Sequence, residues 1–320
     1  MKLTKEEFLR KIREDLSALT EEELRNAEKY YDEYFADKQD DEPEIGSYGD
    51  DSSNEADEVK TESDTAKQGE KSKRNSDDSE DNEEIGTIRR VHPTDRIVNI
   101  KIGAGIAKFN VNKTQEKDIV INAQDVVIDD FKSEINGDTL TISYDPRNSR
   151  KGLFSLISLP RWQKTPLIDI DIPENMVFDK FKIDGGVGNY DIEYVNTNSL
   201  TMDGGVGKVT IRSSRIDNLK VDAGVGSIDI NGDIGEMKLG VGVGSVNVRG
   251  SISRDIKVDG GVGGVILDLA GDINNYDVKA ESGIGAVRIN GEKGDIYKNK
   301  GAPYKLRVDG GIGGINVNIR

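Results

Sequence analysis

Apolar and polar residues alternate along the second half of the chain in a pattern that repeats. Each repeat reads as a short strand, a glycine corner built on the phrase Lys-Val-Asp-Gly-Gly-Val-Gly, and a second short strand. A degenerate copy of the corner precedes them at Ile102–Ala107. A period of about 20 residues is typical of a stacked repeat architecture. The glycine before the central aliphatic residue recurs at nearly even spacing, with two longer intervals at the end, namely at Gly186, Gly205, Gly224, Gly242, Gly261, Gly283 and Gly311.

Both strands of each repeat offer paired aliphatic side chains to one interior, because residues two apart on a strand face the same side. The first strands supply Phe181 and Ile183, Leu200 and Met202, Leu219 and Val221, Met237 and Leu239, Ile256 and Val258, and Leu306 and Val308. The second strands supply Tyr190 and Ile192, Val209 and Ile211, Ile228 and Ile230, Val246 and Val248, Val265 and Leu267, Val287 and Ile289, and Ile315 and Val317. We expect a third inward row from the corners, made of Val187, Val206, Val225, Val243, Val262, Ile284 and Ile312.

Stacking these rows at about 4.8 Å per coil gives continuous internal ladders. The prediction for residues 87–320 is therefore a mainly β domain, a right-handed single-stranded β-helix or β-solenoid with coils of about 19 residues. The corner glycines fit sites where the chain reverses with positive φ and little bulk. Outward positions form a row of mostly Lys and a row of mostly Asp, interrupted at Gly240, and nearly every acid lies two residues from a base on one face. Such exposed pairs chiefly favour solubility.

The first 37 residues carry the signals of two short helices. Thr4 with Glu7, and Thr20 with Glu23, are capping boxes, in which hydroxyl and carboxylate satisfy amides of the first helical turn. Apolar residues follow each box at helical spacing. We predict a helical hairpin over residues 1–37, too small to be stable alone. Its candidate interaction face is the aromatic group Tyr30, Tyr31, Tyr34 and Phe35.

The hairpin resembles the opening half of the HAAS signalling domain of Gram-positive bacteria. The resemblance rests on Lys5–Leu9, Leu16–Glu23 and Tyr30–Phe35. It implies a helical signalling module of the kind that is found ahead of transmembrane or solenoid segments.

Residues 38–86 read as a disordered acidic linker, because Asp, Glu, Ser, Asn and Lys dominate and aliphatics are almost missing. From Asp40 to Glu84 there are 18 acidic and 5 basic residues, a balance of −13 out of the net charge of −16. No basic stripe is left to neutralise phosphates, so nucleic acid is excluded as a partner.

The repeat phrase resembles the adhesin-like β-solenoid family of unknown function that is common in bacteria. Lys257–Val265 carries the likeness most clearly, and the similarity extends over about residues 95–320. It implies a solenoid fold, for which a HAAS-like module at the N-terminus is a known pairing.

The sequence offers no chemistry that points to an enzyme, a metal site or a cofactor site. There is no cysteine and only one histidine, His92. In the calcium-binding solenoid motif the sixth residue supplies a carboxylate, whereas Gly204-Gly205-Val206-Gly207-Lys208-Val209 has a core valine there. Phosphate-binding glycine loops precede a helix, and these precede strands. Acids that repeat on every coil also differ from the single cluster that a polysaccharide lyase or hydrolase would need.

One insertion breaks the acidic character of the chain. From Arg147 to Pro166 there are five basic residues and no acid. The segment favours either a cap on the solenoid or a contact with an anionic membrane or a partner. The residues that would make such a contact are Arg147, Arg150, Lys151, Phe154, Arg161 and Trp162.

These observations favour a non-enzymatic interaction or assembly scaffold, linked to bacterial cell-envelope signalling or adhesion through its N-terminal module. The alternative is a carbohydrate-binding or polysaccharide-active β-helix protein. We expect a protein partner, with a membrane protein of the envelope as one candidate. No apolar run reaches about 18 residues and the N-terminus lacks a signal-peptide core, so we expect a cytoplasmic location with peripheral membrane contact. The last strand, Ile315–Arg320, would leave a bare coil edge, which predicts self-association unless Gly294–Tyr304 covers it.

Overall fold

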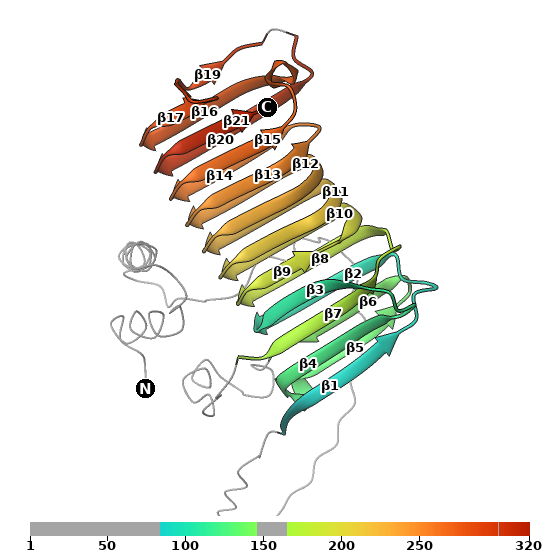
Figure 1. Cartoon of the computed structure of the whole chain (residues 1–320). Helices are drawn as coiled ribbons and strands as arrows, with labels where there is room; N and C mark the ends of the chain where they lie inside the picture. The colour runs from blue at the N-terminus through green and yellow to red at the C-terminus, as the bar shows by residue number, and fades with distance from the viewer. Residues whose placement is uncertain (1–83, 146–164, 300) are drawn as a thin grey trace, which may run out of the picture.

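The computed structural model describes residues 84–145, 165–299 and 301–320, which form a tall stack of β-coils (Figure 1). The predicted helical hairpin, nearly all of the predicted linker and the basic insertion lie outside the described residues. The N-terminal part contains β1 (Ile85–His92), β2 (Asn99–Ile106), β3 (Lys108–Thr114), β4 (Ile119–Val127), the 3-10 turn η1 (Ile128–Asp130), β5 (Phe131–Asn136), β6 (Thr139–Tyr144) and β7 (Leu167–Pro173).

The remaining described residues continue the stack, again almost entirely as strands. The middle contains β8 (Phe178–Val187), β9 (Tyr190–Glu193), β10 (Asn196–Val206), β11 (Val209–Val225), β12 (Ile228–Val243), β13 (Val246–Ile252), β14 (Ile256–Val262) and β15 (Val265–Ala270). The C-terminal part contains η3 (Ile273–Asn275), β16 (Tyr276–Ile284), β17 (Val287–Ile289), β18 (Glu292–Lys293), β19 (Ile296–Tyr297), β20 (Tyr304–Ile312) and β21 (Ile315–Ile319).

Each coil contributes one strand to each of two parallel walls. Equivalent positions of the repeat pair from coil to coil, as Leu200 with Leu219 in the first wall and Ile211 with Ile230 in the second. Strands β11 and β12 are long enough to pass through both walls. This register confirms the predicted β-solenoid.

The core lies between the two walls and consists of the predicted pairs. Every residue of the first-strand and second-strand sets is buried, except Val287, which is partly buried. Val278 and Ala280 complete the first wall in the coil of β16 and β17. The two-residue alternation thus specified the interior correctly.

The corner row does not join this core, and the prediction that it points inward is wrong. Val225 and Val243 form a separate apolar cluster, against which Val206 and Val262 pack. Other members of the row lie at the surface, and Ile284 is 68% exposed. Regular pairing breaks off at the second glycine of the phrase and resumes one residue later, so alternation no longer determines which way the next side chain points.

The corner glycine that adopts a positive φ is the third glycine of the phrase, not the second. Gly226 and Gly244 both have φ of 142°, and a Cβ on either would overlap the carbonyl oxygen of the equivalent glycine one coil away. The amide of Gly226 donates to the carbonyl of Val243 at 2.8 Å. At the second glycine the requirement is space alone, because a Cβ on Gly205 would lie 2.7 Å from the carbonyl oxygen of Gly186.

At the N-terminal end the coils do not follow chain order. The coil of β2 and β3 lies between the coil of β6 and β7 and the coil of β8 and β9. Beyond it, β4 pairs antiparallel with β7, β1 with β4, and β5 with β6. These antiparallel strands close the N-terminal end of the stack (Figure 1).

The C-terminal end is rearranged in the same manner. Strands β20 and β21, the last in the sequence, lie between the coil of β14 and β15 and the coil of β16 and β17. The expected bare edge at the C-terminus is therefore wrong, because that coil is paired on both sides. The segment before Tyr304 does cover an edge, but of the preceding coil: β18 pairs with β17 and β19 with β16, both antiparallel.

Candidate functional site

All ten residues proposed from the sequence as contact sites lie outside the described residues. They are Tyr30, Tyr31, Tyr34 and Phe35 of the hairpin, and Arg147, Arg150, Lys151, Phe154, Arg161 and Trp162 of the insertion. What the structure does describe is the repeated surface of the solenoid, on which a long groove and two charged faces lie.

A shallow groove runs along the outer side of the first wall, through the Asp-Gly-Gly part of every repeat. It extends from Gly103 and Ser143 at the N-terminal end to Glu281 and Asp309 at the C-terminal end. We call it the glycine groove, because its floor is made by the paired glycines of successive coils. Glycine produces the hollow directly, since it has no side chain to fill the space beside the Asp row.

The acids that border the glycine groove are held by the bases of their own strand. The ion pairs Lys182–Asp184, Lys220–Asp222, Lys257–Asp259 and Lys279–Glu281 have N–O distances of 2.9, 2.7, 2.7 and 2.7 Å. The hydrogen bond to Asp222 raises the pKa of Lys220, and Asp259 does the same for Lys257. The predicted pairing between residues two apart is confirmed at these four coils.

In the coil of Asp203 the base is replaced by Thr201. Two further coils depart from that rule. At Gly240 the Asp222 carboxylate takes up the free space, since a Cβ there would lie 2.6 Å from Asp222 Oδ1, and Lys238 pairs with Glu236 at 2.7 Å. Arg307 was expected to pair with Asp309, but it binds Asp277 of the neighbouring coil at 2.7 Å. That second exception follows from the coil order, which places β20 beside β16.

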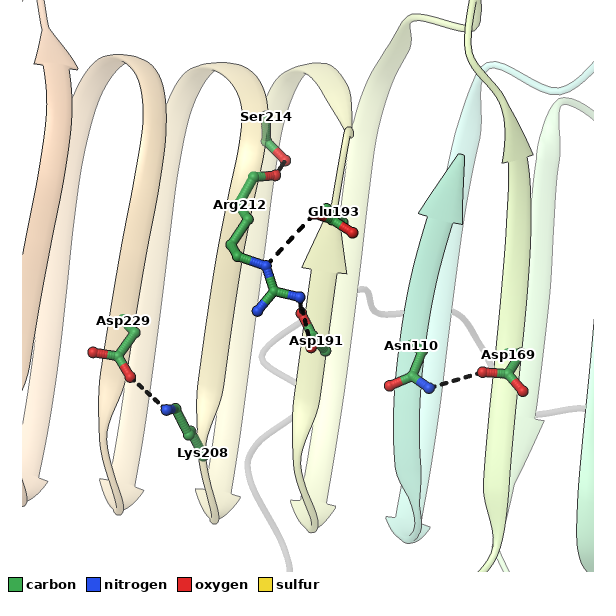
Figure 2. A network of polar contacts seen from close by, with 8 residues as sticks. All are labelled: Asn110, Asp169, Asp191, Glu193, Lys208, Arg212, Ser214 and Asp229. Carbon is green, nitrogen blue, oxygen red and sulfur yellow. Dashed lines mark hydrogen bonds and ion pairs between the residues drawn. The ribbon is translucent and has the colours of Figure 1, made fainter. Parts of the chain in front are cut away.

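The outer side of the second wall carries charges that link one coil to the next (Figure 2). Arg212 of β11 reaches Asp191 at 2.9 Å and Glu193 at 3.6 Å, both on β9. Lys208 likewise reaches Asp229 on β12 at 2.7 Å. These contacts bridge neighbouring coils on the outside of the solenoid.

Elsewhere on the same wall, side-chain amides bind acids of the neighbouring coil. Asn110 donates to Asp169 at 2.8 Å, Asn247 donates to Asp229 at 3.0 Å, and Asn318 donates to Asp268 at 2.7 Å. An amide stacked on a carboxylate supplies a donor where a second acid would repel. The sequence analysis missed this network, although Asn and Asp at equivalent outward positions of successive repeats could have signalled it.

The repeat phrase and the stacked register agree with one known family. The Toastrack DUF4097 family matches residues 97–305, about two thirds of the chain. The chain belongs to the Toastrack DUF4097 family. The match begins at residue 97, so the resemblance of residues 1–37 to the HAAS domain stays a prediction.

Several solved structures resemble this Toastrack chain at low identity. A putative cell adhesion protein from Clostridium sporogenes is 21% identical with a TM-score of 0.37, and the match covers 74% of this chain and all of that one. A putative adhesin from Bacteroides fragilis is 16% identical with a TM-score of 0.40, over 74% and 98% of the two chains. A putative lipid binding protein from Parabacteroides distasonis is 13% identical with a TM-score of 0.35, over 73% and 97%. These values are too low for the names to bear on the function of this chain.

A comparison with curated proteins finds no match. Within residues 84–145, 165–299 and 301–320 of the Toastrack chain, no group of three or more His, Asp or Glu side chains is placed to hold a metal ion. His92 lies in the N-terminal cap, where its Nε2 is 2.9 Å from the Ser133 hydroxyl, and burial and nearby Arg90 lower its pKa. Within the same ranges, no helix is long and apolar enough to cross a membrane.

Proposed function

We propose that the protein is a non-enzymatic interaction and assembly scaffold, which acts in bacterial cell-envelope signalling or adhesion through its N-terminal helical module. The observation that carries this proposal is the uniformity of the outer faces. Beside the glycine groove the same pair of residues recurs along the stack, as Lys182–Asp184, Lys220–Asp222 and Lys257–Asp259. A surface that repeats offers many equivalent weak contacts, which suits an extended partner.

In this proposal the solenoid is a rigid body and the hairpin is the module that selects a protein partner. Tyr30, Tyr31, Tyr34 and Phe35 give the hairpin an aromatic face, and aromatic side chains are enriched at the energetic centres of interfaces. The insertion residues from Arg147 to Trp162 would add a second contact, with the partner or with anionic lipid.

A polysaccharide ligand is the alternative, and the length of the glycine groove favours it. A glycosidase, however, needs two carboxyl groups whose surroundings drive their pKa values apart. Along the groove Asp184, Asp222 and Asp259 have closely similar surroundings, each beside a lysine of its own strand. The described lining residues also include no aromatic side chain on which a sugar ring could stack.

One experiment on the full-length protein distinguishes the interaction scaffold from the polysaccharide-binding alternative. The immobilised protein is incubated with solubilised cell envelope, in parallel with a variant in which Tyr30, Tyr31, Tyr34 and Phe35 are replaced by serine. We expect a discrete protein to be retained by the wild type, to be lost with the variant, and to be insensitive to added envelope polysaccharide. Retention of polysaccharide by both proteins, or release of reducing ends from it, would overturn the proposal. An unchanged unfolding midpoint of the variant shows that its solenoid is intact.

A further inference from the structure

The two ends of the solenoid differ in the length of their outermost strands. At the C-terminal end these are β18 and β19, with two residues each. At the N-terminal end, among the described residues, β1 has eight residues and pairs only with β4, and β5 has six and pairs only with β6. Strand β1 is also one strand further out than β5, because β4 lies between β1 and the coil of β6 and β7 (Figure 1). The longest edge therefore lies at the end opposite to the one that the sequence predicted.

Half of the backbone groups of β1 are directed to this outer edge. The amide of Ile128 donates to the carbonyl of Glu84 at 3.0 Å, and successive residues of a strand direct their amides and carbonyls to opposite sides. The irregularity after Gly86 adds its extra residue to β4, where Asp125 has φ of 55°, so the alternation along β1 continues. The even-numbered residues of β1 thus face β4, and the residues that face the outer edge are Ile85, Thr87, Arg89 and Val91.

The side chains of these four residues are all exposed on the outer face of the second wall. Ile85 and Val91, near the two ends of the strand, are 47% and 45% exposed. The charges are divided between the ends as well, since the acid Glu84 precedes the strand and Arg89 and Arg90 lie in its second half. A strand with one acidic and one basic end is complementary in charge to an antiparallel copy of itself.

We propose that two copies of the chain associate through their β1 strands, which pair antiparallel about a two-fold axis at Ile88. In this register Ile85 of each copy lies opposite Val91 of the other, so that each pair covers two exposed apolar side chains. Arg89 lies opposite Thr87, and Arg90 lies opposite Gly86. One residue beyond the strand, Glu84 comes opposite His92 and beside Arg90.

The arginines select this register against its neighbours. Residues that lie opposite each other must share a face of the sheet, so the register can change only in steps of two residues on the other strand. One step places Arg89 opposite Arg89 of the other copy, and the next places Arg90 opposite Arg90, which is unfavourable. A step in the other direction shortens the pairing to Ile85–Arg89. The register about Ile88 is therefore the longest one without like charges opposite each other.

The β5 strands stay apart in this assembly. Because β1 is one strand further out in each copy, three strand spacings, about 14 Å, would separate the two β5 strands. The second wall alone continues from one copy to the other, and the two solenoids point in opposite directions. This association concerns two copies of one chain, so it does not rest on the proposed function.

The absence of native cysteine allows a test of the register in the full-length protein. One variant carries Ile85→Cys and a second carries Val91→Cys. Within a dimer of either variant the two cysteines lie six residues apart along the strands, about 20 Å, which is too far for a disulfide. In a mixed dimer they lie opposite each other. A single pair of strands makes a small interface, so a Kd of about 100 µM is expected, and oxidation is carried out near that concentration.

We expect covalent dimers from the mixture of the two variants and none from either variant alone. A mixture of Ile85→Cys with Lys132→Cys, an exposed position on β5, is the matched control and should also give none. No covalent dimer in the Ile85→Cys and Val91→Cys mixture would overturn the proposal. Equal amounts from the single variants, or from the mixture with Lys132→Cys, would do the same, because such dimers do not depend on the register.

A charge exchange tests the same pairing at equilibrium, without oxidation. Thr87→Lys places a lysine opposite Arg89 at two symmetric positions, so we expect dimerisation in sedimentation equilibrium to weaken about tenfold. Adding Arg89→Glu to Thr87→Lys turns both contacts into opposite charges and should restore it. Lys132→Glu on β5 should leave the Kd unchanged. A Kd that ignores Thr87→Lys would overturn the proposal, and one that responds only to Lys132→Glu would assign the interface to β5 instead.

Discussion

The middle coils and the two ends of the solenoid are built from the same repeat but are ordered differently. From β8 to β15, coils that are consecutive in the sequence are also neighbours in the stack. At each end a coil far away in the chain is inserted instead: β2 and β3 at one end, β20 and β21 at the other. The repeat phrase therefore determines the shape of a coil, whereas the connections between coils determine which coils are neighbours.

The rearranged order of the end coils protects the exposed edges of the stack, which the middle coils do not have. A coil at the end of a stack has unpaired backbone groups, and such an edge can recruit another chain. Here the terminal coils are covered by antiparallel strands, and the C-terminal strand is placed one coil inward. This arrangement needs pairing between strands that are far apart in the sequence, as between Ile256 and Leu306, so the ends carry a larger loop-closure cost than the middle.

The largest expected effect comes from removing the inserted coil. A chain that ends before Tyr304 loses five buried aliphatic residues, each worth about 1.5–3 kcal/mol: Leu306, Val308, Ile315, Val317 and Ile319. It also leaves β16 without its parallel neighbour. We expect the amides of β16 to lose their protection in hydrogen-exchange mass spectrometry.

The control is Lys305→Ser, an exposed substitution in the same coil, which should keep the protection of β16. If the truncated chain protects β16 as the full chain does, then β16 can stack directly on β14. In that case the insertion of β20 contributes little to the end of the solenoid.

The contrast between the middle coils and the ends also explains which parts of the fold could be predicted from the sequence. Pairs such as Leu219 and Val221 were predicted to be buried, because two-residue alternation is a local property of a strand. The order of the end coils was not predicted, since every coil offers the same backbone edge to its neighbours. The two longer intervals in the glycine series, before Gly283 and before Gly311, were the only sign that the connections differ there.

The surface was predicted less well than the core. Val187 and Ile312 were placed inside because alternation was extended through the glycines, where the backbone no longer follows it. The glycine groove and the contact between Arg307 and Asp277 depend on which coils are neighbours, so a single repeat could not reveal them. Ion pairs within one strand, such as Lys220 with Asp222, were found because both partners lie on one face of one strand.

Substituting the third glycine of the phrase should reduce stability more in the middle coils than in the end coil. Gly244→Ala combines an unfavourable φ with an overlap between coils, so we expect a loss of about 3 kcal/mol or more in urea denaturation. Gly285 has a similar overlap with Gly313, but its coil has only one neighbouring coil and can shift, so Gly285→Ala should cost less. Gly271→Ala, with φ of 150° and open space around it, should cost about 1 kcal/mol. Equal losses at all three positions would mean that the overlap between coils is not what requires glycine.

The inserted N-terminal coil should make stability depend on pH in alkaline solution. Tyr190 is buried and stacks on Phe109 of β3 at 5.7 Å, and burial raises its pKa to about 12. A pKa raised above the unfolded value of about 10 stabilises the fold fully below pH 10, and this contribution is lost as pH rises from about 10 to 12.

We expect Tyr190→Phe to keep more of its stability than the wild type across that range, by about 2 kcal/mol at its upper end. Denaturant midpoints at pH 9, 10, 11 and 12 measure the difference. Curves that stay parallel for the two proteins would show that the Tyr190 hydroxyl ionises as freely in the folded chain as in the unfolded one.

The smallest effect should come from the charges beside the glycine groove, and it should not distinguish the middle from the end. Lys220 and Lys279 have side chains that are 54% and 45% exposed, and each pairs within its own strand, whichever coils are its neighbours. Exposed pairs of this kind contribute about 0–1 kcal/mol and are screened by salt. Lys220→Ser and Lys279→Ser should therefore shift the free energy of unfolding by about 0.5 kcal/mol or less, and the shift should vanish in about 1 M salt. A clearly larger loss of stability for Lys279→Ser than for Lys220→Ser, persisting in salt, would mean that surface charge stabilises the end coil but not the middle coils. The position of the end coil would then not be determined by backbone pairing and burial alone.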